Sequence, residues 1–299
     1  MNLNGHYAIA PEALGRLFPL AEQLQAASTN APPAAPTVFQ IVEDTAIINV
    51  AGVIFPKANI FTLFGFGVAI DSLAAQLSAA ENHPAINRVM FAFDSPGGHI
   101  SGVNEFSNQI SATTKPTTAY VSGMAASAAY WLAASCNEIV TEATAVLGSI
   151  GVVAVMSIPG SDVIEIVSTH ASDKRPDPTT DSGKDTIRAT LNELEAVFHQ
   201  SIATHRPALS IETMKALRGG IRVGANAVSS GLADRVGSQN GVIYGAAQAP
   251  NNTSATIAPK DQNNGWAAAM KNAVNPQQRK SASLAGALAK VQLDELFNR

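Results

Sequence analysis

Residues 88–98 read RVMFAFDSPGG. The apolar and aromatic run at the start of this segment predicts a buried strand, and the Pro-Gly-Gly that follows predicts a tight turn. An apolar helical pattern begins directly afterwards, near Ile100. Because a strand that leads through a turn into a helix is the first half of a βαβ unit, this segment predicts a parallel sheet.

Strands and helices alternate on both sides of this segment. Residues 45–55 form a near-continuous run of β-branched and apolar side chains, as expected of one strand buried on both faces. Ile70, Leu73 and Leu77 then recur at the spacing of a helix. The pattern predicts further strands near residues 118–121, 139–140 and 150–155, and helices at residues 127–136 and 184–205, the second of them capped by residues 181–183. We therefore predict an α/β fold with a mainly parallel sheet.

Composition divides the 299-residue chain into three parts. Residues 1–37 predict a helix at 12–27 and then a Pro-rich linker. Residues 38–248 hold the alternating strands and helices and form the predicted main domain. Residues 249–299 are rich in Asn, Gln, Ser and Ala, which predicts a polar, flexible tail with a short helix near its end.

Charge and cysteine content exclude several classes of protein. The net charge of −4 leaves no basic footprint for nucleic acid. Charged residues make up only 14% of the chain, a composition that favours self-association into homo-oligomers. The single cysteine, Cys136, cannot form an intrachain disulfide and is expected to be buried. Neither a signal peptide nor an apolar run long enough to span a bilayer is evident, so we expect a cytoplasmic protein without a membrane anchor.

A second informative segment, residues 122–131, reads SGMAASAAYW. Its central serine, Ser127, is predicted at the first turn of a helix, where backbone N–H groups are unpaired and the helix dipole favours negative charge. The N–H of Ala128 is one candidate donor for an oxyanion, and Gly97 or Gly98 supplies the other. Small residues and a glycine turn also suit tight packing, but the two segments together favour an acyl-transfer site without metal or cofactor.

The base that would activate Ser127 is less evident. His99 lies beside the glycine turn and is one option. A lysine is the other, because a buried amine can be neutral near pH 7. Composition does not choose among the lysines at Lys57, Lys115, Lys174, Lys184 and Lys215.

Taken in order, these segments resemble the signal peptide peptidase A family of serine peptidases, and within it the phage branch of lambda-type head maturation proteases. The resemblance runs from about Ile47 to Gly237. It rests on six segments: Ile47–Ile54, Asp94–Gly98, Met124–Trp131, Leu147–Val152, Arg222–Ala227 and Gly231–Asp234. The ordered set is specific, whereas the serine segment alone is not.

The resemblance implies a ClpP/crotonase-like fold of stacked βαβ units and catalysis by a Ser–Lys dyad. The lysine of the family lies in a loop ahead of a long helix, and this position corresponds to Lys174, with Lys184 as its rival. The resemblance also implies ring-like homo-oligomers whose active sites form near subunit boundaries.

The leading hypothesis for function is a phage or prophage capsid-assembly protease that cleaves scaffold or capsid proteins in the host cytoplasm or procapsid. The Pro-rich N-terminal part, the polar tail and the expected lack of an anchor favour this branch. A soluble housekeeping peptidase that degrades signal peptides is one alternative. A catalytically silent scaffold protein of the same fold is another.

Overall fold

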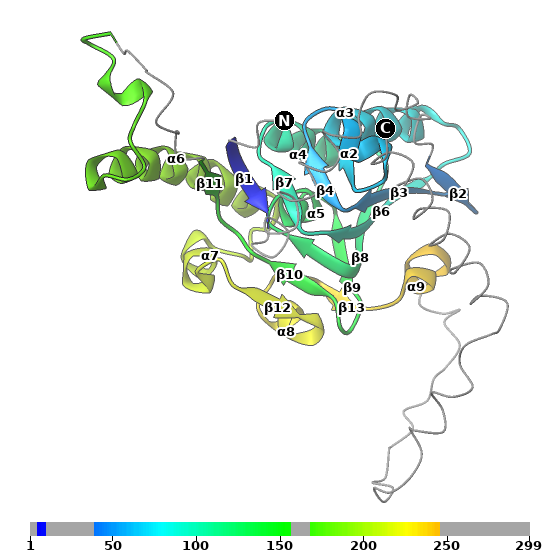
Figure 1. The fold of residues 1–299 in the computed structure, drawn as a ribbon. Coiled ribbons are helices and arrows are strands. Elements are labelled where there is room, and N and C mark those ends of the chain that lie inside the picture. Colours follow the sequence, from blue (N-terminus) through cyan, green and yellow to red (C-terminus); the bar gives the residue numbers. More distant parts are fainter. Residues whose placement is uncertain (1–4, 10–38, 157–167, 246–299) are drawn as a thin grey trace, which may run out of the picture. The chain divides into compact units, whose positions relative to one another are not determined.

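The computed structural model describes residues 5–9, 39–156 and 168–245 (Figure 1). The chain divides into two compact units, residues 1–249 and residues 250–299. All described residues belong to the first unit. The helices predicted near the two ends of the chain, together with the polar tail, lie outside the described residues.

The larger sheet confirms the predicted α/β fold with a mainly parallel sheet. Its strands lie in the order β12-β10-β8-β6-β3-β2, and β9 pairs with β8 and with β13. The pairs β3–β6, β6–β8, β8–β10, β8–β9 and β9–β13 are parallel, whereas β2 and β12 pair antiparallel with their neighbours. The strands are β2 (Gln40–Val42), β3 (Thr45–Ala51), β6 (Arg88–Ser95), β8 (Thr117–Ala126), β9 (Glu138–Thr141), β10 (Val146–Gly148), β12 (Ile221–Val223) and β13 (Arg235–Val236).

A smaller sheet stands beside it, with the order β11-β1-β7-β4-β5. Strand β4 pairs parallel with β5 and β7, whereas β1 is antiparallel to both of its neighbours, β7 and β11. The strands are β1 (Gly5–Ile9), β4 (Val53–Phe55), β5 (Gly67–Ala69), β7 (Gly97–His99) and β11 (Val153–Val155). The N-terminal strand therefore joins two strands that come from the middle of the chain.

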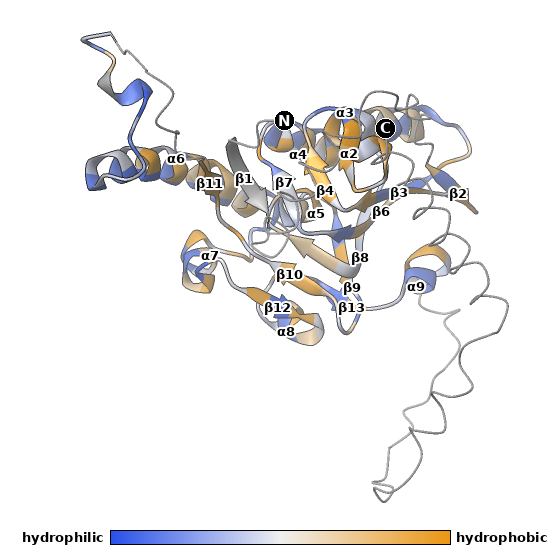
Figure 2. Ribbon diagram, viewed as in Figure 1, coloured by the Kyte–Doolittle hydropathy of each residue, from blue (hydrophilic) through white to orange (hydrophobic). Residues whose placement is uncertain are grey.

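The helix α3 lies where the spacing of apolar residues predicts a helix. Ile70, Leu73 and Leu77 are buried on one face of α3, as predicted. Figure 2 shows hydrophilic and hydrophobic residues along α6, which is buried mainly toward its C-terminal end. The helices are α2 (Ile60–Leu63), α3 (Ile70–Asn82), α4 (Val103–Ala112), α5 (Ala128–Ala134), α6 (Asp181–His205), α7 (Ile211–Leu217), α8 (Gly224–Ser229) and α9 (Gln239–Tyr244), with a 3₁₀ turn η1 (Ser172–Lys174).

The prediction of one strand over residues 45–55 was wrong. The run breaks at Gly52, so that β3 enters the larger sheet and β4 the smaller one. Gly52 has φ 69°, and a Cβ there would lie 2.4 Å from the carbonyl oxygen of Phe66. The break therefore requires glycine, both for its backbone conformation and for the close approach of the chain.

Two smaller boundaries also differ from the sequence-based prediction. Of the strand expected over residues 150–155, only Val153–Val155 form a strand, β11, because the chain turns after β10. The cap of α6 is Thr180, not residues 181–183, since its hydroxyl accepts the N–H of Gly183 at 3.1 Å. Such shifts of a few residues are common at helix and strand ends.

Helix α5 anchors the interior, and each of its residues is 1% exposed or less. The indole of Trp131 stacks on the ring of Phe198 in α6, with centroids 4.2 Å apart and planes 10° apart. The indole N–H also donates to Ser201 Oγ at 2.8 Å. Ser107 Oγ lies 3.3 Å from Ser201 Oγ and 2.6 Å from Ser135 Oγ. This buried hydroxyl network ties α4, α5 and α6 together with its polar atoms satisfied.

Asp234 binds the residue that ends α6, Arg206, the C-cap of the helix. Arg206 donates two hydrogen bonds of 2.7 Å to the carboxylate of Asp234, which also accepts the N–H of Ile139 in β9 at 2.7 Å. Partial burial alone would raise the pKa of Asp234, but these donors outweigh it and hold the pKa below its usual value. Asp234 thus acts as a clamp: its carboxylate links the C-terminal end of α6 to strand β9 of the larger sheet.

We expect Asp234→Asn to lower the free energy of unfolding by roughly 1–3 kcal/mol, because a charged acceptor of three hydrogen bonds is lost. Asp185→Asn is the matched control, since the pair of Asp185 with Arg188 lies on the exposed surface of α6. That pair is worth about 1 kcal/mol or less. Urea unfolding followed by circular dichroism measures both variants. Equal losses would show that Asp234 is no clamp.

Candidate active site

Ser127 stands directly between a strand and a helix. Strand β8 ends at Ala126 and α5 begins at Ala128, so Ser127 is the N-cap residue of α5. Its φ of 55° and ψ of −120° place it in a region that a residue with a side chain adopts only under strain, at about 1–3 kcal/mol. A strained serine at a sharp strand-to-helix turn is the arrangement that presents the nucleophile in α/β-hydrolases.

Backbone hydrogen bonds hold Ser127 in this conformation. Its N–H donates to the carbonyl oxygen of Gly148 at 2.8 Å, and its own carbonyl accepts the N–H of Trp131 at 2.9 Å. The hydroxyl does not cap the helix but donates to the carbonyl oxygen of Gly151 at 3.4 Å. Ser127 is 1% exposed. The hydroxyl is therefore oriented by backbone from the segment after β10.

The glycine turn after β6 is held by Ser95. Its hydroxyl donates to the carbonyl oxygen of Gly52 at 2.6 Å and accepts the N–H of Gly97 at 3.2 Å. Gly97 has φ 93°, which favours glycine. A Cβ on Gly98 would lie 2.0 Å from the carbonyl oxygen of Ile54. Gly98 is thus required for the packing of β7 on β4.

The two predicted oxyanion donors lie on neighbouring elements, because α5 packs against β7. Ala128 is the first residue of α5, and the first N–H groups of a helix have no acceptor within the helix. The N–H of Gly97 already donates to the hydroxyl of Ser95. An oxyanion bound between Ala128 and Gly97 would therefore have to share this N–H with Ser95 or displace the Ser95 hydroxyl from it. The assignment of Gly97, Gly98 and Ala128 as donors stays a prediction.

The predicted base, Lys174, is at the end of η1 and is exposed, whereas Ser127 is buried. Within the described part of the chain, no hydrogen bond joins the two residues. The backbone N–H of Lys174 donates to Ala171 at 3.1 Å, which defines the turn. The pairing of Ser127 with Lys174 therefore stays a prediction.

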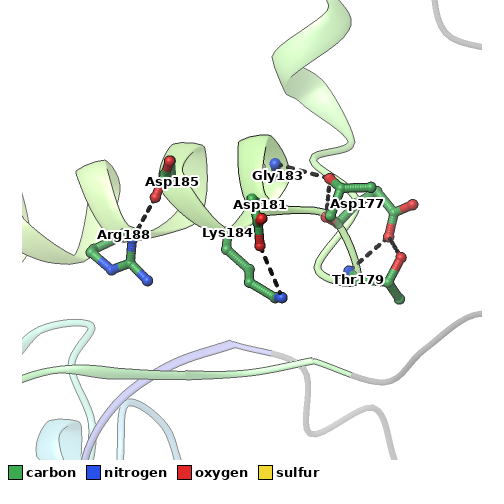
Figure 3. Close-up of polar contacts among 8 residues, drawn as sticks. Asp177, Thr179, Asp181, Gly183, Lys184, Asp185 and Arg188 are labelled. Atoms are coloured by element: carbon green, nitrogen blue, oxygen red, sulfur yellow. Dashed lines mark hydrogen bonds and ion pairs between the residues drawn. The ribbon is translucent and has the colours of Figure 1, made fainter.

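The rival lysine, Lys184, lies on the first turn of α6 (Figure 3). It forms an ion pair with Asp181 at 3.5 Å. Just before the helix, the carboxylate of Asp177 accepts the N–H and the hydroxyl of Thr179 at 2.8 and 2.7 Å. These contacts fix the turn that leads into α6 and engage Lys184 locally.

Two other candidate bases are also engaged elsewhere. Nδ1 of His99 accepts the N–H of Ser101 at 3.1 Å. The ammonium of Lys115 donates to the carbonyl oxygens of Ala80 and His83 at 2.9 and 2.8 Å. Neither contact involves Ser127.

Cys136 is buried, and burial raises the pKa of its thiol to about 12, so the thiol stays protonated at neutral pH. Within residues 5–9, 39–156 and 168–245, no three His, Cys, Asp or Glu residues are grouped as metal ligands. The helices in these ranges are all too short or too polar to cross a bilayer.

No individual role is predicted from the sequence for Gly148 and Gly151, whose carbonyl oxygens accept hydrogen bonds from Ser127. Gly148 has φ 122°, and the next residue, Ser149, has φ 53°. The signal was present in the sequence, because two glycines three residues apart after a strand indicate an irregular backbone that approaches another segment closely.

Part of this region matches a known family of peptidases. The model of peptidase family S49 matches residues 109–159, which include Ser127, Gly148 and Gly151. The chain is 23% identical over 209 residues to the capsid assembly protease C of Escherichia phage lambda, a match that covers 66% of this chain and 47% of that protein. It is 24% identical over 192 residues to Protease 4 of Salmonella typhi, with coverage of 60% and 31%.

These matches confirm the predicted resemblance to the signal peptide peptidase A family and its phage branch. The chain spans less than half the length of either relative. Among solved structures, it is similar to the ClpP protease catalytic domain from Plasmodium falciparum, with a TM-score of 0.42 and 16% identity. That match covers 64% of this chain and 85% of the other.

The strain at Ser127 makes a prediction about stability. We expect Ser127→Gly to be more stable than Ser127→Ala by about 1 kcal/mol, because glycine adopts this φ without a Cβ clash. Ser78, an exposed residue in the interior of α3, is the matched control, and there the order reverses, since glycine is the poorer helix former by about 1 kcal/mol. Thermal unfolding of the four variants checks this. The same order at both positions would contradict a strained Ser127.

Proposed function

We propose that this chain is a serine endopeptidase with Ser127 as nucleophile and Lys174 as base. The observation that carries the proposal is the backbone of Ser127, which is strained between β8 and α5 while its hydroxyl is left out of the helix cap. A fold retains such strain where the position of the side chain matters for function. The relatives named above, both proteases by name, support the same reaction class.

In the proposed reaction, Ser127 Oγ attacks the carbonyl carbon of a peptide bond while Lys174 acts as the general base and takes the hydroxyl proton. The negative charge that develops on the carbonyl oxygen is stabilised by the N–H groups of Ala128 and Gly97, and each such donor is worth roughly 3–4 kcal/mol. The lysine then gives the proton to the leaving amine. Water, activated by the same amine, hydrolyses the acyl-enzyme and releases Ser127.

This mechanism requires Lys174 to approach Ser127. In the described arrangement Lys174 is exposed on η1, and its segment precedes the capped start of α6. We propose that the approach accompanies assembly into a homo-oligomer, where Lys174 meets Ser127 of the same or a neighbouring copy. The apolar residues Ile187, Leu191 and Leu194 are only half-buried in the single chain, which is in keeping with further burial in an assembly.

For the substrate, we propose scaffold or capsid proteins of a phage, cleaved in the host cytoplasm or procapsid. The support for this finer statement is the similarity to a phage capsid assembly protease. No membrane anchor or nucleic-acid partner forms part of the proposal.

The test compares three variants of the full chain on fluorescein-labelled casein and with a fluorophosphonate probe. We expect Ser127→Ala to abolish both casein cleavage and labelling. Lys174→Met should lower cleavage on the order of a thousandfold, because a catalytic member of the site is lost. Lys184→Met is the matched control and should retain cleavage, since Lys184 pairs with Asp181.

Unchanged cleavage by Ser127→Ala would reject the nucleophile, and unchanged cleavage by Lys174→Met would reject the base. A chain that is neither labelled nor active, yet assembles, would indicate a silent scaffold protein. Trimming of capsid proteins co-expressed from neighbouring genes separates the phage role from a housekeeping peptidase, which would cut only free peptides.

A further inference from the structure

The N-terminal strand β1 lies between two strands that flank the candidate active site (Figure 1). One neighbour is β7, which contains Gly97, and the other is β11, which follows Gly151. Among the described strands, β11 pairs only with β1. Without β1, the backbone N–H and C=O groups that β7 and β11 direct toward it would therefore lose this hydrogen-bonding partner.

The register places the end of β1 opposite the glycine turn that follows β6. Tyr7 is opposite both His99 and Val153, and Ile9 is opposite Gly97. The pairing of β1 with β11 ends at Tyr7 and Val153, two residues after Gly151 in the chain. The carbonyl oxygen of Gly151 accepts a hydrogen bond from the hydroxyl of Ser127, and Gly97 is a predicted oxyanion donor. The end of β1 is thus in register with Gly97, and the strand that pairs with its other edge begins just after Gly151.

A strand bonded on both edges is a general way of binding an extended peptide, because the main chain supplies the affinity whatever the sequence. Here the bound peptide is a segment of the same chain. Since β1 is joined covalently to the rest of the chain, its effective concentration at this site is on the order of millimolar. A peptide from another molecule must compete with β1 at that concentration. Ser127 is 1% exposed in this arrangement, so a substrate has no open access to it.

We propose that β1 occupies in cis the position at which an extended peptide substrate binds, and that it blocks the site until it leaves. This inference rests on the proposed role of Ser127 as nucleophile. The strand site is the pair of backbone edges formed by β7 and β11, and its substrate class is an extended, unfolded protein segment. Displacement of residues 5–9 is then the step that opens the enzyme.

A disulfide can lock β1 in place within the full chain. Tyr7 and Val153 are directly opposed, so cysteines at these positions have the Cα separation that a disulfide needs. We expect the variant Tyr7→Cys/Val153→Cys to form the bond on oxidation, as seen by mass spectrometry of unreduced peptides. Locking should slow fluorophosphonate labelling of Ser127 by about tenfold or more, and reduction should reverse the effect.

The matched control is Tyr7→Cys/Ala154→Cys, which is shifted by one residue. Side chains of successive strand residues point to opposite faces, so this pair should not form the bond. Equal disulfide yields in both variants, or equal labelling of the locked and reduced chain, would overturn the proposal. If the bond forms but neither the reduced chain nor an Ala8→Pro variant, in which proline weakens the pairing of β1 with β7, is labelled, the nucleophile assignment fails while the strand position stands.

Discussion

The backbone of Ser127 is the constraint on which the rest of this structure depends. A positive φ at a residue with a side chain persists only where its surroundings hold it. The carbonyl of Gly148 fixes the amide of Ser127, and the burial of α5 fixes the helix that follows. The stacking of Trp131 on Phe198 joins α5 to α6, which is distant in sequence. Strain at one residue is thus supported by an extensive core.

The site is built largely from main-chain groups. Ser95 orients the glycine turn, and Gly148 and Gly151 contribute carbonyl oxygens. Glycines occur where two backbones approach too closely for a Cβ, as at Gly98 beside Ile54. Because main-chain groups recognise other main chains, the same architecture suits both catalysis on a peptide bond and the binding of β1 as a strand.

The sequence predicted the parallel sheet, α3 and the strand-to-helix position of Ser127, because each depends on local periodicity and turn chemistry. It did not predict the break at Gly52, since the run on both sides is equally apolar and only the approach of Phe66 reveals the break. It did not predict β1 either, because five residues without alternation carry no signal and the partners are remote. The place of Lys174 relative to Ser127 depends on a turn whose geometry no local pattern encodes.

The central proposal is that Ser127 is the nucleophile and that the N–H groups of Ala128 and Gly97 stabilise the negative charge that develops on the carbonyl oxygen of the substrate. The most direct measurement is a crystal structure of the full chain after reaction with a fluorophosphonate. The predicted result is a phosphonyl group on Ser127 Oγ, with one oxygen within about 2.7–3.1 Å of both backbone nitrogens. An adduct on another residue, or an oxygen directed away from both N–H groups, would contradict it.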